Sequence, residues 1–453
     1  MKHHFHFNRI WPFALLLLSI SGFSAPSFGA SHSETDAYPL RDAIEFTPRD
    51  GLPNIFRKLD DGDEVSIAYF GGSITEQGGW RLQSLAWFRE EYPDATVKQI
   101  NAALGGTGSS LGVFRLEGDV IEHHPDLIFV EFAVNDSGVK PDEIIKAMEG
   151  IVRKIWQASN TTDICFVYTM TKSESRQLAA GKLQRSASVM EAVADHYGIP
   201  SICLGLEAAD MEAAGKLIMK TDAPMTRVSG DELNEAAMMA TDEQGRIIFS
   251  KDGVHPYPET GHVLYTQALV RSMEQSQYDA DTLAHPLPDP IDPDNWVMAQ
   301  QLTITEAMLS GPWEILSPEN DQLAKQFNRR MHPIYRLQPG AELTFRFKGS
   351  KVAVYDLMGP TGAVVEVTRD GKTWKSKRMD AYCTYYRLAT MDIGRNLDPD
   401  TVHEVVIRVL DEPVDRKQTL FEKNRKDVDK NPQKYEGSFF YPGGILIVGE
   451  LVE

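Results

Sequence analysis

The chain has 453 residues, of which 42% are hydrophobic and 25% charged, a composition typical of globular proteins and unlike that of disordered, collagen-like or disulfide-scaffold chains. With 46 Lys and Arg against 65 Asp and Glu, its formal net charge is −19, so the chain repels phosphate backbones and anionic lipid headgroups. We therefore expect no nucleic-acid partner, and the length predicts two domains or three small ones.

The first 30 residues have the pattern of a secretory signal peptide. Lys2 and Arg9 precede an apolar run that contains Ala14–Leu18, and small residues follow it. The run is too short to span a bilayer, so we expect no membrane span in the mature protein. The chain is predicted to be secreted or periplasmic, with a cleavage point that the small residues leave undefined.

Three cysteines do not make a disulfide framework, even in an exported protein. Cys165 and Cys203 fall in apolar runs, and Cys383 lies far downstream. We expect three buried thiols that behave as small hydrophobic side chains. A bridge between Cys165 and Cys203 stays open as an alternative if their strands are neighbours.

Between residues 65 and 204, short apolar runs alternate with longer amphipathic stretches, which predicts βαβ units around a parallel sheet. We expect strands at Val65–Phe70, Val97–Asn101, Leu127–Phe132, Ile164–Met170 and Pro200–Leu204, and helices near Trp80–Glu91, Gly112–His123, Pro141–Gln157 and Gly181–Tyr197. Residues 205–250 predict a helical excursion over the sheet, and a last helix is expected near Glu259–Gln275. The predicted α/β domain covers residues 40–280.

A proline-rich linker, residues 284–296, separates this domain from a region with a different period. Beyond it, alternating apolar and polar residues predict an antiparallel β-sandwich of jelly-roll type over residues 297–453. Its expected strands include Leu343–Phe347, Val352–Tyr355, Val364–Val367 and Val405–Val409, and the charged stretch Asp411–Pro432 is expected to be a solvated loop.

Three short motifs follow successive predicted strands of the parallel sheet. Gly71–Thr75 places Ser73 after the first strand, Asn101–Gly108 is a glycine-rich loop after the second, and Ala133–Asp136 places Asn135 after the third. Ligands of open α/β sheets bind at this edge. Each motif is weak evidence alone, because a serine there is more often a helix N-cap and Asn-Asp is an ordinary turn dipeptide.

A fourth motif, Asp252–Pro256, precedes the last predicted helix, with Asp252 three residues before His255. A carboxylate at this spacing can hold the imidazole by its Nδ1 hydrogen. Glu259 precedes His262 and Asp400 precedes His403 at the same spacing, so spacing alone decides nothing. Of the three histidines, only His255 is expected to follow the parallel sheet as a loop residue.

With these four motifs in this order, residues 60–275 resemble the SGNH hydrolases, also called GDSL-type esterases and lipases. Two positions depart from the usual pattern: Gly72 stands where the family usually has Asp, and Ala133 where it usually has Gly. Neither position carries the family's chemistry. The departures weaken an assignment to the lipase branch more than an assignment to hydrolysis.

The resemblance implies a flavodoxin-like, three-layer catalytic domain with Ser73 as nucleophile, His255 as general base and acid, and Asp252 as the group that orients His255. An oxyanion hole would be formed by the Ser73 and Gly106 amides and the Asn135 side chain. The chemistry requires a base for the serine hydroxyl and preplaced donors for the oxyanion. No metal or cofactor is implied.

Secreted enzymes of this family with an added β-sandwich resemble carbohydrate esterases, so the expected substrate is an acetylated polysaccharide or oligosaccharide. Trp80 is a candidate wall of the pocket, although a tryptophan at a helix start is more often packing. A lipase, arylesterase or thioesterase acting on small or lipid esters is the alternative enzyme. A non-catalytic carbohydrate-binding protein is the alternative from another class, and the sequence leaves both the sandwich's role and the oligomeric state open.

Overall fold

The structure is a computed structural model that describes residues 38–221, 241–276 and 284–452. Residues Tyr38–Glu453 form one compact unit. The expected signal peptide lies outside the described residues. Within the described part of the chain, no helix combines the length and the apolar character needed to cross a membrane.

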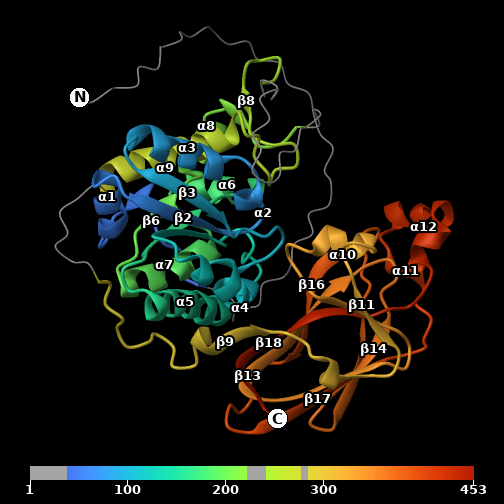
Figure 1. The fold of residues 1–453 in the computed structure, drawn as a ribbon. Helices are drawn as coiled ribbons and strands as arrows, with labels where there is room; N and C mark the ends of the chain where they lie inside the picture. The colour runs from blue at the N-terminus through green and yellow to red at the C-terminus, as the bar shows by residue number, and fades with distance from the viewer. Residues whose placement is uncertain (1–37, 222–240, 277–283, 453) are drawn as a thin grey trace. The chain divides into compact units, whose positions relative to one another are not determined.

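The first region is built on a six-stranded sheet in the order β1-β6-β5-β4-β2-β3 (Figure 1). Its strands are β1 Phe46–Thr47, β2 Glu64–Gly71, β3 Thr96–Asn101, β4 Leu127–Glu131, β5 Asp163–Tyr168 and β6 Ser201–Cys203. β2 to β6 are parallel, and β1 adds an antiparallel edge. The parallel order is the flavodoxin-like one, so the five predicted strands and the predicted fold class are confirmed.

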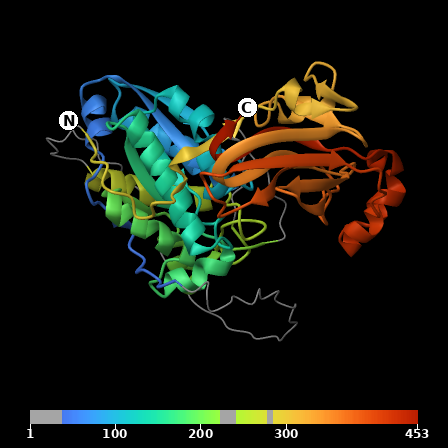
Figure 2. The same ribbon diagram turned by 90° about the horizontal axis from the view of Figure 1, so that it is seen from below.

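Helices cover both faces of this sheet (Figures 1 and 2). α3 Trp80–Glu91 and α9 Gly261–Ser276 pack on one face, and α4 Ser109–Asp119, α5 Pro141–Ala158 and α7 Arg185–Tyr197 pack on the other. α5 begins with a proline and two acidic residues in its first turn, and α7 ends at Gly198 with a φ of 66°. Both ends follow ordinary helix start and stop chemistry, which is why the sequence locates these helices.

Several elements differ from the expected ones. α1 Pro53–Asp60 and α6 Lys172–Ala179 were not predicted, and the helix expected from residue 181 begins at Arg185. α6 starts in a capping box in which Thr171 and Glu174 satisfy each other's backbone amides. In the expected helical excursion, α8 Leu206–Ala213 is followed by the paired strands β7 Leu217–Ile218 and β8 Ile247–Ile248, and residues 222–240 lie outside the described part.

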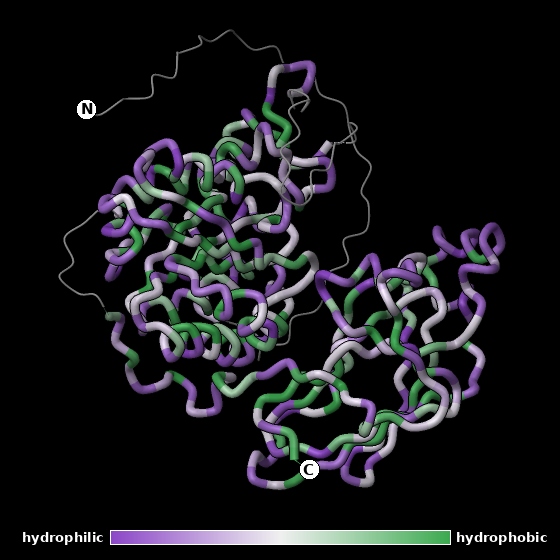
Figure 3. Tube along the Cα trace, viewed as in Figure 1, coloured by the Kyte–Doolittle hydropathy of each residue, from purple (hydrophilic) through white to green (hydrophobic). Residues whose placement is uncertain are grey.

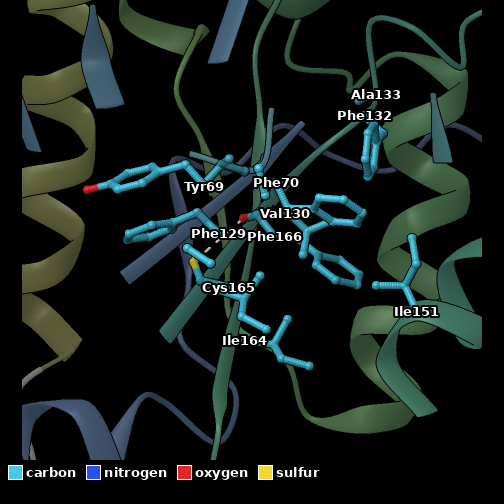
Figure 4. Packing of buried hydrophobic residues seen from close by; sticks show 14 of the residues in the cluster. Tyr69, Phe70, Phe129, Val130, Phe132, Ala133, Ile151, Ile164, Cys165 and Phe166 are labelled. Atoms are coloured by element: carbon cyan, nitrogen blue, oxygen red, sulfur yellow. Dashed lines mark hydrogen bonds between the residues drawn. The ribbon is translucent and has the colours of Figure 1, made fainter. Parts of the chain in front are cut away.

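The core of this region lies on both faces of the central strands (Figure 4). Tyr69 and Phe129 point to one face, and Phe70 and Phe132 point to the other, toward Ile151 of α5 (Figure 4). All five side chains are fully buried. Burial of each large apolar side chain contributes about 1.5–3 kcal/mol, so the ends of β2 and β4 are held in a rigid interior.

The second region is an antiparallel β domain, as predicted. Its strands are β9 Ala299–Leu302, β10 Leu309–Ser310, β11 Trp313–Leu316, β12 Ile334–Leu337, β13 Glu342–Met358, β14 Val364–Arg369, β15 Lys372–Lys377, β16 Arg387–Gly394, β17 Val402–Val409 and β18 Tyr441–Val452. The two strands expected within 343–355 are one strand, β13, so that prediction is wrong. The polar residues between the two expected strands continue to pair with β18, with a register shift between Gly349 and Lys351.

β13 pairs with β17 through its first half and with β16 through its second half, while β18 runs along its other side. Apolar residues from all of these strands share one core. The predicted solvated loop at 411–432 instead holds short helices, α11 Arg416–Thr419 and α12 Lys426–Lys430, although it is largely exposed. Figure 3 shows hydrophilic residues around α12 and apolar stretches along the strands of both regions.

The predicted linker is bound to the first region. His285 stacks on Trp156 with ring centroids 4.8 Å apart, and its Nε2 lies 2.7 Å from Asp163 of β5. Trp296, the last residue of the predicted linker, packs against Phe114 of α4. A Cβ at Gly150 of α5 would lie 2.6 Å from the Trp296 carbonyl carbon, so glycine is required for this approach. The two regions therefore pack together within a single compact unit.

Candidate active site

The loops after β2, β3 and β4 lie beside the point where the strand order reverses, between β2 and β4. Open α/β sheets bind ligands at such a reversal. A Cβ on Gly71 would lie 2.7 Å from the Glu131 carbonyl oxygen, and one on Gly72 would lie 2.0 Å from Asn135 Oδ1. The two glycines therefore let the turn before Ser73 lie directly against the loop that carries Asn135. The departure noted at Gly72 has this local reason.

The structure brings Ser73, His255 and Asp252 together. Ser73 opens the short helix α2 Ser73–Glu76, and its Oγ lies 2.8 Å from His255 Nε2. His255 Nδ1 lies 2.7 Å from Asp252 Oδ2. Two distant stretches of chain thus form one hydrogen-bonded series from hydroxyl to imidazole to carboxylate.

Asp252 also shapes the turn that carries His255. Its Oδ1 accepts hydrogen bonds from the Val254 and His255 amides, at 2.9 and 2.8 Å. Partial burial raises the pKa of Asp252, but hydrogen bonds from the His255 ring and these amides outweigh burial and lower the pKa below its usual range. The carboxylate is therefore ionised at neutral pH and fixes both the backbone and the ring of His255.

The same turn is anchored to the rest of the first region. Gly253 has a φ of 85°, a conformation that favours glycine. Its amide donates to Ser250 Oγ at 2.7 Å, and its carbonyl accepts from the Lys172 amide at 2.7 Å. The Ser250 hydroxyl donates to the Met219 carbonyl at 2.6 Å. These hydrogen bonds tie the turn that carries His255 to Lys172 and Met219.

The expected oxyanion donors, Gly106 and Asn135, line the same cavity as Ser73 and His255. Gly106 has a φ of 75°, which explains the glycine-rich loop after β3. Asp136, in the loop after β4, ties this loop to α4. Its buried carboxyl accepts a hydrogen bond from the Ser109 amide, at the start of α4, at 3.1 Å. Residues from two loops that carry amide groups therefore share this cavity with the serine.

Two carboxyl groups buried behind Ser73 had no role in the sequence-based prediction. Glu131, the last residue of β4, accepts from Thr75 Oγ1 at 2.9 Å and from Thr169 Oγ1 at 2.7 Å. Burial raises the pKa of Glu131 to about 7 and that of Asp136 to about 7, although hydrogen bonds to each oppose the rise. The signal for Glu131 was in the sequence: a carboxyl directly after four apolar residues of the central strand.

A cavity of about 1140 Å³ opens above Ser73. Its lining includes Ser73, Gly106, Asn135 and His255 from the first region, and Lys351, Tyr385, Tyr386 and Arg387 from the second. Tyr385 is 55% exposed. The site is therefore large, lined by polar as well as apolar residues, and walled partly by the β domain.

Trp80 is not part of this wall, so the expectation for it is corrected. The side chain is fully buried, with its ring 5.4 Å from Tyr69 and 5.9 Å from Phe129 by centroids. Its backbone amide donates to His262 Nδ1 at 3.1 Å. Trp80 turns inward because it starts a helix that packs on the sheet.

The other residues considered as sites behave as structural ones. His262 is fully buried in α9, and burial lowers its pKa to about 3. His403 pairs with Asp370 of the β domain, and its predicted spacing partner Asp400 is not its contact. Cys165, Cys203 and Cys383 are all buried free thiols, as expected. Although β5 and β6 are neighbours, Cys203 pairs with Tyr168 in the ladder, so no bridge to Cys165 forms.

Residues 69–260 match the model of the GDSL-like lipase/acylhydrolase family. This stretch is a GDSL-like lipase/acylhydrolase domain. The match spans all four motifs, from the strand before Ser73 to the turn that carries His255. The predicted family is therefore confirmed for this stretch, which is a hydrolase domain of the GDSL type.

Solved structures resemble the GDSL-like domain and the β domain together. A two-domain esterase active on acetylated mannans, co-crystallised with mannopentaose, has a TM-score of 0.67 at 17% identity and covers 92% of this chain and 100% of its own. A second structure, of a two-domain esterase active on acetylated mannans, has a TM-score of 0.66 at 18% identity and covers 90% of this chain and 98% of its own. At this identity the likeness shows a shared two-domain fold. No curated protein matches the chain.

Proposed function

We propose that the protein is a secreted serine esterase that removes acetyl groups from a polysaccharide. The observation that carries the proposal is the series from Ser73 Oγ through the His255 ring to Asp252, with contacts of 2.8 and 2.7 Å, whose serine and histidine line a large cavity. A hydroxyl within reach of an oriented imidazole, beside amide donors, is what acyl transfer requires.

In the first half of the reaction, His255 Nε2 takes the proton of Ser73 Oγ as the oxygen attacks the acetyl carbonyl carbon. The negative charge on the carbonyl oxygen is stabilised by the Ser73 and Gly106 amides and the Asn135 side chain. His255 then returns the proton to the departing sugar oxygen, which leaves acetyl-Ser73. Asp252 holds the ring and stabilises its charged form throughout.

In the second half, water replaces the sugar alcohol. His255 takes a proton from the water as its oxygen attacks the acetyl-serine carbonyl, and the same donors stabilise the second oxyanion. Collapse expels Ser73 Oγ, which regains its proton from His255, and acetate leaves. Atoms and charges balance with water as the co-reactant.

The polymeric substrate is supported by the cavity and by the structural neighbours. A volume of about 1140 Å³ far exceeds what an acetyl group needs, and the exposed ring of Tyr385 offers a face for a sugar. Acetylated mannans are the substrate named for the similar two-domain esterases. Secretion is supported by the pattern of the first 30 residues.

Ester hydrolysis by the wild type and by Ser73→Ala tests the reaction. We expect release of p-nitrophenol from the acetate ester by the wild type, and its loss in Ser73→Ala while circular dichroism shows an intact fold. Activity that survives in Ser73→Ala would refute the serine mechanism, and a wild type without activity would favour the carbohydrate-binding alternative. A strong preference for octanoate over acetate would favour the lipase alternative.

Release of acetate from acetylated mannan, xylan and pectin tests the substrate. Tyr385→Ala is the informative variant, because its ring lies in the cavity wall and is largely exposed. We expect this variant to lose activity on polymer several-fold and to keep activity on the small ester. Equal activities of Tyr385→Ala and the wild type on every polymer would show that the β domain does not bind the chain there.

A further inference from the structure

The loop that follows β3, residues 101–107 and here called the oxyanion loop, is fixed at its base by the sheet. The Ala102 amide donates to the Tyr69 carbonyl at 3.1 Å, and the Leu104 amide donates to the Gly71 carbonyl at 2.9 Å. Both bonds extend the β2–β3 ladder past its end. They hold the loop up to Leu104, immediately before the two glycines at its tip.

The tip is held by a side chain from the serine's own helix. Glu76, the last residue of α2, accepts a hydrogen bond from the Gly105 amide through Oε2 at 2.9 Å. A Cβ at Gly105 would lie 2.7 Å from this oxygen and 3.5 Å from the Ser73 Cβ. Glycine at position 105 thus lets the loop lie directly against both Ser73 and Glu76, and Gly106 follows at once.

The other oxygen of Glu76 is bound by the β domain. Arg330 follows α10 Gln322–Phe327 and forms an ion pair with Glu76 Oε1. Tyr355 of β13 donates to the Arg330 carbonyl at 3.2 Å. The adjacent Arg329 donates to the carbonyl of Asn101, the first residue of the oxyanion loop, at 3.3 Å. One turn of the β domain therefore contacts both the base of the oxyanion loop and the carboxylate that holds its tip.

We propose that Glu76 and Arg330 are positioning residues that hold the Gly106 amide in place for the oxyanion, and that through them the β domain takes part in the chemical step. This inference rests on the proposed function, in which Gly106 is a donor. Glu76 alone could turn away on its flexible side chain. Arg330 fixes the carboxylate from the opposite side, so the Gly105 amide meets an oxygen at one defined point.

Donors that act on the oxyanion stabilise the transition state more than the bound substrate. A displaced Gly106 should therefore lower kcat and leave KM nearly unchanged. This distinguishes positioning from two other roles. A residue that binds the sugar chain would change KM on polymer, and a residue that only stabilises the fold would change the melting temperature without changing kcat of the folded enzyme.

The test uses the full chain and p-nitrophenyl acetate, which is too small to need the rest of the cavity. For Arg330→Gln we expect kcat to fall about 3- to 10-fold, and for Glu76→Ala about 10- to 100-fold, with KM within twofold of wild type in both. Because both residues act through one contact, the double variant should be no slower than Glu76→Ala. Arg330→Lys should recover most of the loss.

Arg395→Gln is the matched control. Arg395 is also an arginine of the β domain that pairs with a glutamate of the first region, Glu143 of α5, and it is about as exposed as Arg330. Arg395 also pairs with Asp392 of β16 and lines the cavity, but its hydrogen bonds and ion pairs are to Asp392 and Glu143 and not to the oxyanion loop. We expect kcat of Arg395→Gln on the small ester to stay within twofold of wild type. This result would separate the loss of the Glu76–Arg330 pair from the loss of any ion pair between the two regions.

The inference would be overturned if Arg330→Gln left kcat unchanged, or if it raised KM instead of lowering kcat. It would also be overturned if kcat fell equally in Arg395→Gln and Arg330→Gln. A double variant whose loss equals the product of the single losses would do so too. If Glu76→Ala does not fold, Arg330→Gln decides alone, because its side chain is 40% exposed. Activity that persists in Ser73→Ala would instead refute the proposed function, a result that these variants cannot mimic.

Discussion

Each region of the molecule holds a histidine whose Nδ1 faces an aspartate, but the two pairs differ in what the other ring nitrogen meets. In the GDSL-like domain, His255 Nδ1 lies 2.7 Å from Asp252 and its Nε2 lies 2.8 Å from the Ser73 hydroxyl. In the β domain, His403 Nδ1 lies 2.8 Å from Asp370 and its Nε2 lies 3.1 Å from the Asp398 carbonyl.

The second partner decides what each ring can do. A carbonyl oxygen only accepts hydrogen bonds, so both nitrogens of His403 face acceptors. Neither nitrogen faces a group from which it could take a proton. A hydroxyl can donate, so His255 has a nitrogen that can act as a base. The surroundings agree: His403 is buried beside Phe347, whereas His255 lines a cavity. A carboxylate–histidine pair therefore indicates a catalytic base only when the far nitrogen faces a proton donor at an open site.

Alanine at each histidine tests this comparison with the largest expected effect. We expect His255→Ala to lower kcat on p-nitrophenyl acetate about 10⁵-fold, because the serine loses its base. His403→Ala should keep kcat within twofold and lower the melting temperature, because it removes a buried ring and its two hydrogen bonds. A large loss of kcat in folded His403→Ala would contradict the assignment.

The two aspartates sharpen the comparison. Asp252→Asn should lower kcat about 10⁴-fold, because an amide no longer stabilises the charged imidazole and favours the wrong ring tautomer. Asp370→Asn should cost stability and leave kcat on the same ester within twofold. The comparison would fail if Asp252→Asn retained more than a tenth of the wild-type kcat.

Part of the candidate site could be predicted because its signals were local. Asp252 and His255 lie three residues apart, and strand alternation predicted Ser73 at the ligand-binding edge of the sheet. The roles of these residues followed only from the four motifs together and their resemblance to the SGNH hydrolases. The sequence could not show that Asp370 is the partner of His403, because the two lie 33 residues apart on different elements. Arg330 and Glu76 are 254 residues apart, and only the packing of the two regions shows that contact.

The expectation for Trp80 was wrong for a related reason. A tryptophan seven residues after the serine can face the cavity or the sheet, and the choice depends on how α3 lies on the sheet. In the structure, Tyr69, Phe129 and His262 contact it from two strands and a distant helix. Local pattern predicts that an element exists, whereas the direction of one side chain depends on neighbours that are remote in sequence.

A third prediction concerns the donors that the GDSL-like domain places near its histidine. Asn135→Ala should lower kcat about 10²- to 10³-fold, equal to about 2.7–4 kcal/mol of barrier, with little change in KM. Steady-state kinetics on the acetate ester measures it. A rise in KM at constant kcat would assign Asn135 to substrate binding. The surroundings of His255 and His403 would then differ only in the Ser73 hydroxyl that His255 faces.

The smallest effect distinguishes the buried carboxyls of the two regions. In the β domain, Asp356 is fully buried and forms a bidentate pair with Arg378, with both contacts at 2.7 Å. In the GDSL-like domain, Glu131 is equally buried, but the partners that the structure gives its carboxyl are threonine hydroxyls and the Gly72 backbone. One carboxyl therefore has a buried counter-ion, and the other is stabilised by becoming neutral.

This difference predicts opposite responses to an amide. Burial raises the pKa of Glu131 to about 7, so the folded protein keeps a proton that the unfolded chain, with a pKa near 4.5, releases. The free energy of unfolding should therefore fall as pH rises through this window, by up to about 3 kcal/mol. Glu131→Gln should weaken that dependence without abolishing it, because burial also raises the pKa of Asp136 to about 7. Urea unfolding at pH 5.5 and 8 measures the change. Asp356→Asn should instead lower stability at both pH values, because Arg378 loses its partner. An unchanged pH dependence in Glu131→Gln would show that Glu131 is ionised in the folded protein across this range, and the two carboxyls would then be alike.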